Sequence, residues 1–176
     1  QPRTTLTVGY NYQIRPIYTR QIALLTFGYN WMKNNQVQHI LTPVTLNSVK
    51  VEPTPSFAQI LEKETNQRIK DQYTSHLIFG LDYTYIFNNQ DVRFLKDFFY
   101  FKANIQSSGN LISLLNNTSL VKTIDNYHEI FGIRYAQFAR LSLDFRYFKY
   151  IIGENQIATR FMIGAGIPYG NSNDMP

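Results

Sequence analysis

Apolar and polar residues alternate along most of this chain, and a period of two predicts β-strands with two different faces. The clearest stretch is 77–87, where Leu, Phe and Tyr alternate mainly with Gly, Asp and Thr. Pro43 predicts an irregularity in the weakest of the strands. As a whole, the pattern predicts seven strands, at about 5–14, 23–31, 39–51, 77–87, 99–106, 131–147 and 157–167.

The connections between these strands alternate in length after the first hairpin. Two long ones are predicted at 52–73 and 107–127, and each contains a stretch that can form a helix, at 55–72 and 110–117. Short ones are predicted at 14–18, 32–38, 88–95 and 148–156. Short turns at one end and long loops at the other are typical of outer-membrane β-barrels, whose strands have about 9–11 residues.

The aromatic content favours a membrane barrel over a soluble sandwich. The chain has 13 Tyr and 13 Phe, and its charged fraction of 16% is well below the quarter usual for soluble domains. The polar face of the predicted strands carries Gly, Asn, Thr and Gln in place of dense Lys and Glu. Rings gather near strand ends, as at Tyr29 and Trp31, where an amphipathic ring suits the membrane interface.

The apolar face of the strands is therefore predicted to contact lipid. None of its members carries a charge at neutral pH, and a charge there would cost about 2–4 kcal/mol at the midplane. Backbone polar groups cannot stay unpaired in lipid, so the strands are expected to close into an antiparallel transmembrane β-barrel. The predicted lipid-facing residues are Phe27, Tyr29, Trp31, Phe79, Leu81, Tyr83, Phe99, Phe101, Leu141, Leu143, Phe145, Phe161 and Ile163.

Charged residues on the opposite face are predicted to line the lumen. They form a candidate polar network of Asp82, Arg134, Arg140, Asp144, Arg146 and Arg160. The simpler interpretation is a hydrogen-bonded network without a further role, because charges inside a water-filled barrel cost little.

Other kinds of chemistry have no sequence support. The three histidines, His39, His76 and His128, are not spaced as metal ligands, and there is no cysteine. Ser107–Ser108–Gly109 lacks the paired histidine of a nucleophile elbow. The net charge of +5 is scattered along the chain, which disfavours nucleic-acid binding. We therefore predict no enzymatic activity, no metal, no cofactor and no nucleic-acid partner.

The extent of the chain suggests part of a larger barrel. No run of about 18 apolar residues predicts a transmembrane helix, and the first ten residues lack the apolar core of a signal peptide. Seven strands is an odd number, whereas bacterial single-chain barrels have even numbers. Residues 1–176 are therefore predicted to form part of one transmembrane β-barrel domain.

Specific stretches resemble the BamA/TamA family of outer-membrane proteins, in particular its TamA-like branch, sometimes called TamL. ATRFMIGAGIPYGNSNDMP (158–176) resembles the strand that runs outward into the sixth extracellular loop of that family. SHLIFGLDYTYIFNN (75–89), FFYFKANIQSSGNLISLLN (98–116) and YAQFARLSLDFRYF (135–148) are similar to preceding strands of the branch. The resemblance covers most of the chain, and PYGNS at 168–172 is its most specific part.

The resemblance implies a barrel of about 16 strands behind periplasmic POTRA domains, with this chain supplying about the fifth to eleventh strands. Loops 52–73 and 107–127 would then lie outside the cell, and the turns 32–38, 88–95 and 148–156 in the periplasm. Some of the inward-facing charges would clamp the sixth loop, which folds into the lumen in this family. The family's sixth-loop motif and its lateral seam lie outside residues 1–176.

The function implied by the resemblance is assembly of barrel proteins in the outer membrane of a Gram-negative bacterium, or export across that membrane. The implied partners are outer-membrane lipid, client outer-membrane proteins, and possible periplasm-spanning or lipoprotein subunits. Two alternatives remain open on the residues alone. One is a porin or uptake channel, and the other is a soluble ligand-binding β-barrel.

Overall fold

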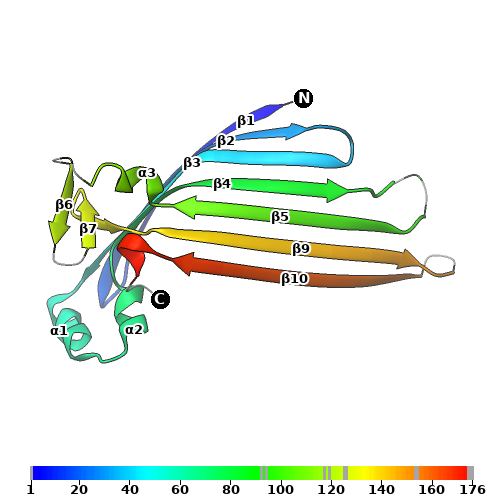
Figure 1. Ribbon diagram of the computed structural model, residues 1–176. Coiled ribbons are helices and arrows are strands. Elements are labelled where there is room, and N and C mark those ends of the chain that lie inside the picture. The colour runs from blue at the N-terminus through cyan, green and yellow to red at the C-terminus, as the bar shows by residue number, and fades with distance from the viewer. Residues whose placement is uncertain are drawn as a thin grey trace.

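Seven long antiparallel strands make up most of the structure, a computed structural model in which residues 2–91, 93, 95–116, 118, 120–124, 127–152 and 155–173 are described (Figure 1). The side chains at 67, 68 and 71 are outside this description. The long strands are β1 (Arg3–Ile14), β2 (Tyr18–Met32), β3 (Val37–Pro53), β4 (His76–Asn88), β5 (Phe98–Ser108), β9 (Phe138–Tyr150) and β10 (Gln156–Pro168). The prediction of an all-β chain is confirmed.

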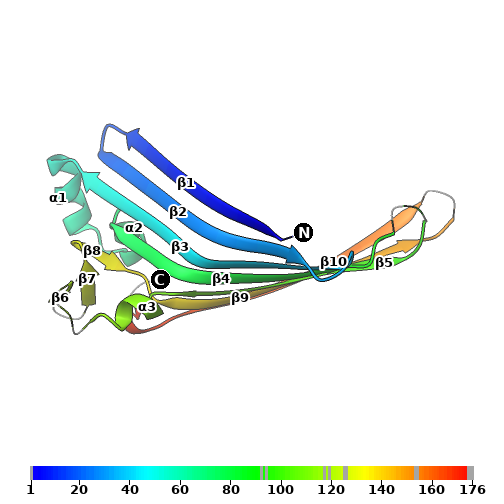
Figure 2. The same ribbon diagram turned by 90° about the horizontal axis from the view of Figure 1, so that it is seen from above.

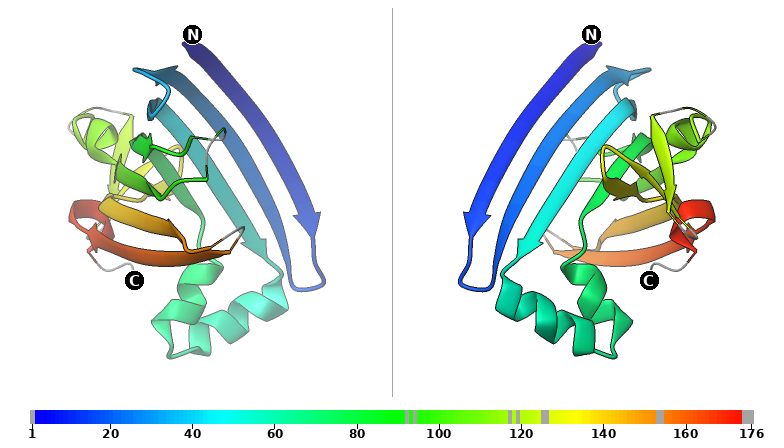
Figure 3. Two further views of the ribbon diagram at one scale, coloured as in Figure 1. Left: turned by 90° about the vertical axis from the view of Figure 1, so that its right-hand side faces the viewer. Right: turned by 90° about the vertical axis from the view of Figure 1, so that its left-hand side faces the viewer.

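Each long strand pairs with its neighbour in the order β1-β2-β3-β4-β5-β9-β10. Within the described residues the sheet is open, with β1 at one edge and β10 at the other. Figures 2 and 3 show that the sheet is twisted and curved rather than flat. One parallel pair, between β4 and the short strand β8 (Ile133–Tyr135), makes the sheet mixed.

The strand positions match the sequence pattern except at the predicted sixth strand. In place of a continuous strand over 131–147, the chain forms β8 and β9, separated by Ala136 and Gln137. The Ala136 N–H donates to the Leu77 carbonyl at 2.8 Å, which draws β8 against the start of β4. The irregularity predicted at Pro43 is present, because the β3–β4 register shifts between Thr42 and Thr45.

The remaining elements lie at one end of the sheet, opposite the end where β2, β4 and β9 finish (Figure 1). The first long connection holds α1 (Pro55–Lys63) and α2 (Gln67–Gln72), and α1 begins with proline, whose missing N–H is not needed there. The second holds α3 (Asn110–Ser113), β6 (Val121–Ile124), β7 (Tyr127–Ile130) and β8, and η1 (Gly170–Ser172) follows β10. Among the described residues, no helix has both the length and the apolar character needed to cross a membrane.

A small hydrophobic core lies at this end of the sheet, which we call the loop end. We call the core, with the residues of the second connection that form it, the loop cluster. Leu77 of β4 is buried with the loop residues Ile112, Val121, Ile130 and Tyr135. Leu46, Phe79 and Ile133 are partly buried against the same cluster. The second connection therefore packs on the sheet, and the face it covers is the one that carries Leu77 and Phe79.

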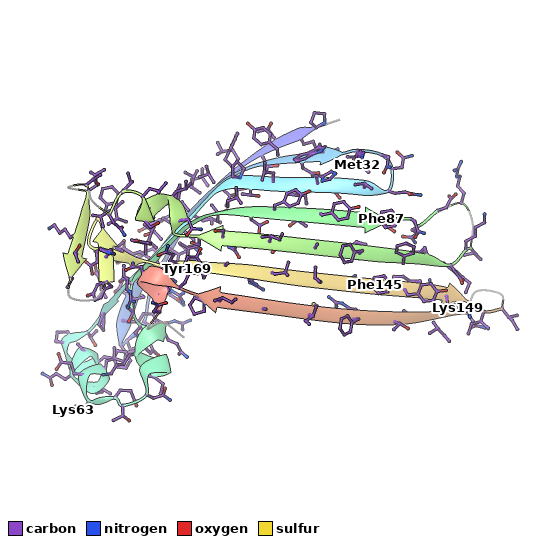
Figure 4. All side chains as sticks on the ribbon, viewed as in Figure 1. Met32, Lys63, Phe87, Phe145, Lys149 and Tyr169 are labelled. Atoms are coloured by element: carbon purple, nitrogen blue, oxygen red, sulfur yellow. The ribbon has the colours of Figure 1, made fainter. Side chains whose placement is uncertain are left out.

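The pairing register separates the two faces of the sheet. Directly paired residues lie on one face, and the row Phe87–Phe101–Phe145–Phe161 runs across four strands. Phe87 and Phe145, labelled in Figure 4, belong to this row. By the same register and alternation, all thirteen residues predicted to contact lipid share this face, which we call the apolar face.

Candidate functional site

The candidate site is a charge cluster on the opposite face, which we call the polar face. Asp144 and Arg146 are two residues apart on β9 and so point to the same side, and Arg160 of β10 pairs directly with Arg146. Strand alternation and register alone are enough to bring these three charges together.

Both arginines bind the same carboxylate through two hydrogen bonds each. Arg146 Nε donates to Asp144 Oδ1 at 3.1 Å and its Nη2 to Oδ2 at 2.6 Å. Arg160 Nε donates to Oδ1 at 3.1 Å and its Nη2 to Oδ2 at 2.8 Å. Such bidentate contacts fix the planes of the groups as well as their distance.

The cluster carries one more positive charge than negative. The Asp144 side chain is only 11% exposed, whereas those of Arg146 and Arg160 are 38% and 53% exposed. Arg146 also lies over the ring of Tyr100, 4.9 Å from the ring centre, which favours a cation there. The arrangement fixes a net positive charge on the polar face, and it leaves Asp144 fully engaged and poorly placed to transfer a proton.

A second polar network lies nearby on β4 and β5. Asn104 Nδ2 donates to Asp82 Oδ2 and to Thr84 Oγ1, each at 2.8 Å. Thr84 is only 6% exposed. This network links neighbouring strands without any cation.

The structure thus brings together three of the six residues predicted to form one lumen network. Asp82 belongs to the separate Asn104 network. Arg140 lies in the same cross-strand row as Asp82, with Gln106 between them, and makes no ion pair among the described residues.

Arg134 lies apart, on β8 at the loop end. Its Nε and Nη2 donate to the Asn171 carbonyl oxygen at 3.0 and 2.6 Å, and its guanidinium lies over the Tyr127 ring. The sequence placed Arg134 on a long strand in line with Arg140, but the break at Ala136 and Gln137 moves it to the loop cluster.

The sequence did not single out the polar contacts that hold η1. Asn171 is 5% exposed, and its amide donates to the carbonyls of His128 and Tyr135 while accepting from the His128 N–H at 2.6 Å. The Gln137 N–H donates to Ser172 Oγ at 2.7 Å. We call this set of contacts, by Asn171 and Ser172 to the β7–β9 segment, the η1 clasp.

Gly170 gives the one local signal for this clasp. Its φ is +52°, a conformation that favours glycine, and a Cβ there would collide with the Gln137 side chain. The glycine of PYGNS therefore marks a turn that puts Asn171 into the loop cluster, although nothing local identifies its partners.

Exposure is distributed unusually between the two faces. On the polar face, exposure of the whole residue is 6% for Thr84 and 8% for Asp144. On the apolar face, most large side chains that the loop cluster does not reach are far more exposed. They include Leu81 (40%), Phe99 (38%), Ile105 (52%), Leu141 (44%), Phe145 (43%), Phe161 (63%) and Ile163 (55%).

Known proteins offer no template for this site. No protein-family model, curated protein or solved structure matches the chain. Within the described residues, no group of three or more acidic or histidine side chains is placed to hold a metal ion. The geometry and the charges of the two faces are therefore what point to a function.

Proposed function

We propose that this chain is part of a transmembrane β-barrel of the outer membrane, and that the barrel belongs to the BamA/TamA type of assembly or export proteins. The observation that carries the barrel is the contrast in exposure between the faces. Large apolar side chains are exposed over several strands, while Thr84 and Asp144 on the other face are buried. This is the reverse of a soluble half-buried sheet and the order expected in lipid.

The dimensions of the strands fit the same proposal. All seven long strands have 11 to 17 residues, at least the 9–11 that a tilted strand needs to cross the hydrocarbon core. Rings also gather toward the short-turn end of the apolar face. There Trp31 stacks on His39 and Phe87 stacks on Phe99, each pair with ring centres 5.1 Å apart. An aromatic girdle at a membrane interface has this composition.

The two sheet edges require further strands if the sheet lies in lipid. Within the described residues, the outer edges of β1 and β10 have no strand partner. Unpaired backbone groups in hydrocarbon cost several kcal/mol each, so additional strands would have to close the barrel.

The BamA/TamA type is supported by the resemblance of 75–89, 98–116, 135–148 and 158–176 to strands of that family. In such a barrel, a weakly paired edge would recruit the strands of a client outer-membrane protein, because an open edge offers backbone groups to an incoming strand. The present strands would form part of the wall opposite or beside that edge, with the polar face toward the lumen.

One observation favours a second candidate, a porin or uptake channel. The cluster of Asp144, Arg146 and Arg160 places a net positive charge on the polar face, and cationic rings in a lumen favour the passage of anions. In this candidate the same barrel is an open pore, and no client strand is recruited.

The test uses the full-length polypeptide that contains residues 1–176, purified from outer membranes and reconstituted in lipid vesicles. A folded barrel is expected to migrate differently on a gel with and without heating. If vesicles that contain the polypeptide speed the folding of a urea-denatured outer-membrane protein, the assembly function is supported. Stable anion-selective conductance without such assistance would favour the channel. A polypeptide that stays in the detergent-free soluble fraction would contradict both.

A further inference from the structure

A cavity lies between the helical connection and the polar face, at the loop end of β2, β3 and β4. It has a volume of about 330 Å³ and is lined by Tyr18, Arg20, Val51, Gln72, Tyr73 and His76. It is separate from the cluster around Asp144, whose residues lie on β9 and β10.

The walls of the cavity follow from strand alternation and register. Tyr18 and Arg20 are two residues apart on β2, and Arg20 pairs with Val51 of β3. His76 pairs with Val49, two residues before Val51, so all four lining residues on the strands share the polar face.

The end of α2 covers this wall. Tyr73 packs edge to face on Tyr18, with ring centres 5.5 Å apart. Phe57 packs edge to face on Tyr73, with ring centres 4.9 Å apart. Ser75 Oγ accepts from the Val51 N–H at 2.9 Å, which fixes the segment that follows the helix. The cover is therefore held in place by three separate contacts.

Arg20 is the unusual member of this cavity. Its Nε is shielded from solvent and has no hydrogen-bond partner, and no described carboxylate forms an ion pair with its guanidinium. None of the six lining residues is acidic. A guanidinium that lacks a partner in a partly enclosed site favours an anion, since charge-assisted hydrogen bonds are about twice as strong as neutral ones.

The other polar groups suit the same ligand. Tyr18 and Tyr73 bring hydroxyl groups and Gln72 an amide, all of which can donate to an oxygen. His76 Nδ1 lies 3.1 Å from the Thr74 carbonyl oxygen and so donates to it. In the neutral ring Nε2 is then an acceptor, so His76 lines the cavity without being a ligand of the anion.

We propose that this cavity binds an oxyanion, a phosphate or carboxylate group carried by a small polar molecule or headgroup, with Arg20 as its main ligand. Arg20 can hold two oxygens of one such group in its planar fork, and the tyrosine hydroxyls complete the contacts. The inference goes beyond the proposed barrel function and does not depend on it, because the site is formed by β2, β3, β4 and the helical connection alone.

The test is isothermal titration calorimetry on the full-length protein at constant ionic strength, with inorganic phosphate, glucose 1-phosphate and acetate as separate probes and chloride as the reference salt. Saturable binding of at least one probe is expected. Tighter binding of phosphate than acetate assigns the site to phosphate groups. Tighter binding of glucose 1-phosphate than inorganic phosphate assigns it to a phosphate carried on a larger molecule.

Three variants separate the site from general charge effects. Arg20→Gln is expected to weaken binding about tenfold or more, the usual scale for loss of a charged hydrogen-bond partner. Arg20→Lys keeps the charge but loses the planar fork. Its affinity should lie between those of Arg20→Gln and the unaltered protein. Arg15→Gln removes the same charge from the adjacent β1–β2 turn, at a residue that does not line the cavity, and should leave the affinity within about twofold.

Tyr73→Phe keeps the ring packing and removes one hydroxyl, so it should fold normally and weaken binding by a smaller factor. Circular dichroism of each variant checks folding before titration. No saturable binding of any probe by the folded protein, or equal affinity in Arg20→Gln and the unaltered protein, would overturn the proposal.

Discussion

Leu77 and Leu81 lie on the same face of the same strand, yet only one of them is covered by protein. Leu77, at the loop end of β4, is 7% exposed beneath Ile112, Val121 and Tyr135. Leu81, four residues along, is 40% exposed. Among the described residues, the apolar face is thus most completely buried at the loop end.

The difference shows where another covering is needed. Soluble monomers rarely expose apolar patches larger than a few hundred Å². Here the uncovered part of the apolar face extends over several strands, from Leu81 on β4 through Leu141 on β9 to Phe161 on β10. In the proposed barrel, lipid covers these residues, and the loop cluster is the part of that face which stands clear of the membrane.

The substitution expected to have the largest effect is Leu143→Arg. Leu143 lies in the cross-strand row Tyr85–Ala103–Leu143–Ile163, in the uncovered part of the apolar face. If lipid covers it, the substitution should lower the free energy of unfolding in vesicles by about 2–4 kcal/mol, the cost of arginine near the midplane. Urea titration followed by heat-dependent gel migration measures this.

Ser142→Arg is the matched control, because it puts the same side chain on the next residue of β9 and on the polar face. It should change the free energy of unfolding much less, since a cation in a watery lumen stays hydrated. Equal effects of the two substitutions would contradict the assignment of the faces. Phe79→Arg is a weaker test, since Phe79 is partly covered by the loop cluster.

The loop end can be tested separately through the η1 clasp. Asn171→Ala removes the partners of the His128 N–H and of the His128 and Tyr135 carbonyls, and Asn171 itself is buried. Leaving such groups unpaired costs about 1–3 kcal/mol, so local protection should fall about tenfold or more. Hydrogen exchange at residues 127–137 measures this.

Asn173→Ala, two residues further along, provides the control, since Asn173 lies beyond η1. It should leave exchange in 127–137 unchanged. If Asn171→Ala also speeds exchange throughout the long strands, the loop end and the sheet unfold together. That result would contradict the prediction that the loop end opens independently of the sheet.

Sequence periodicity predicted the parts of the molecule that depend on local alternation. The seven long strands and the meeting of Asp144, Arg146 and Arg160 follow from a period of two and antiparallel pairing. The irregularity at Pro43 follows from the proline, which has no N–H for the ladder. These features need only the register between neighbouring strands, which short hairpins fix.

The loop end was not predictable in the same way, because its contacts join distant residues. Arg134 bonds to Asn171, and Asn171 bonds to His128, across separations of 37 and 43 residues. The short strands β6 and β7 have only four residues each, too few to establish a period. The cavity at Arg20 likewise depends on the position at which α2 packs on the sheet, and no repeat in the sequence fixes that position.

A smaller effect is expected from Asp144→Asn on the polar face. The substitution removes the charge that separates Arg146 from Arg160, while water still reaches both arginines. We expect a loss of about 1 kcal/mol in the free energy of unfolding, because solvent screens the repulsion. The same urea titration measures the loss, and added salt should reduce it.

Asp82→Asn is the control for this substitution, since Asp82 accepts from Asn104 and has no arginine partner among the described residues. Its effect should be insensitive to salt. A salt-independent loss in Asp144→Asn would mean that the cluster acts through packing rather than charge.

The smallest effect on the sheet is expected from deletion of residues 57–68, which removes most of α1 and the start of α2. The contacts that anchor the two ends of this connection remain, since the Thr54 N–H donates to the Ile17 carbonyl at 2.9 Å and Ser75 stays bonded to Val51. The free energy of unfolding of the sheet should therefore change by less than about 1 kcal/mol. Replacement of 57–68 by an equally long Gly/Ser segment separates loss of the helices from shortening of the loop. If both variants lose the heat-dependent gel shift, the helical connection is part of what holds the strands together, and the loop end cannot be treated as a covering added to an independent sheet.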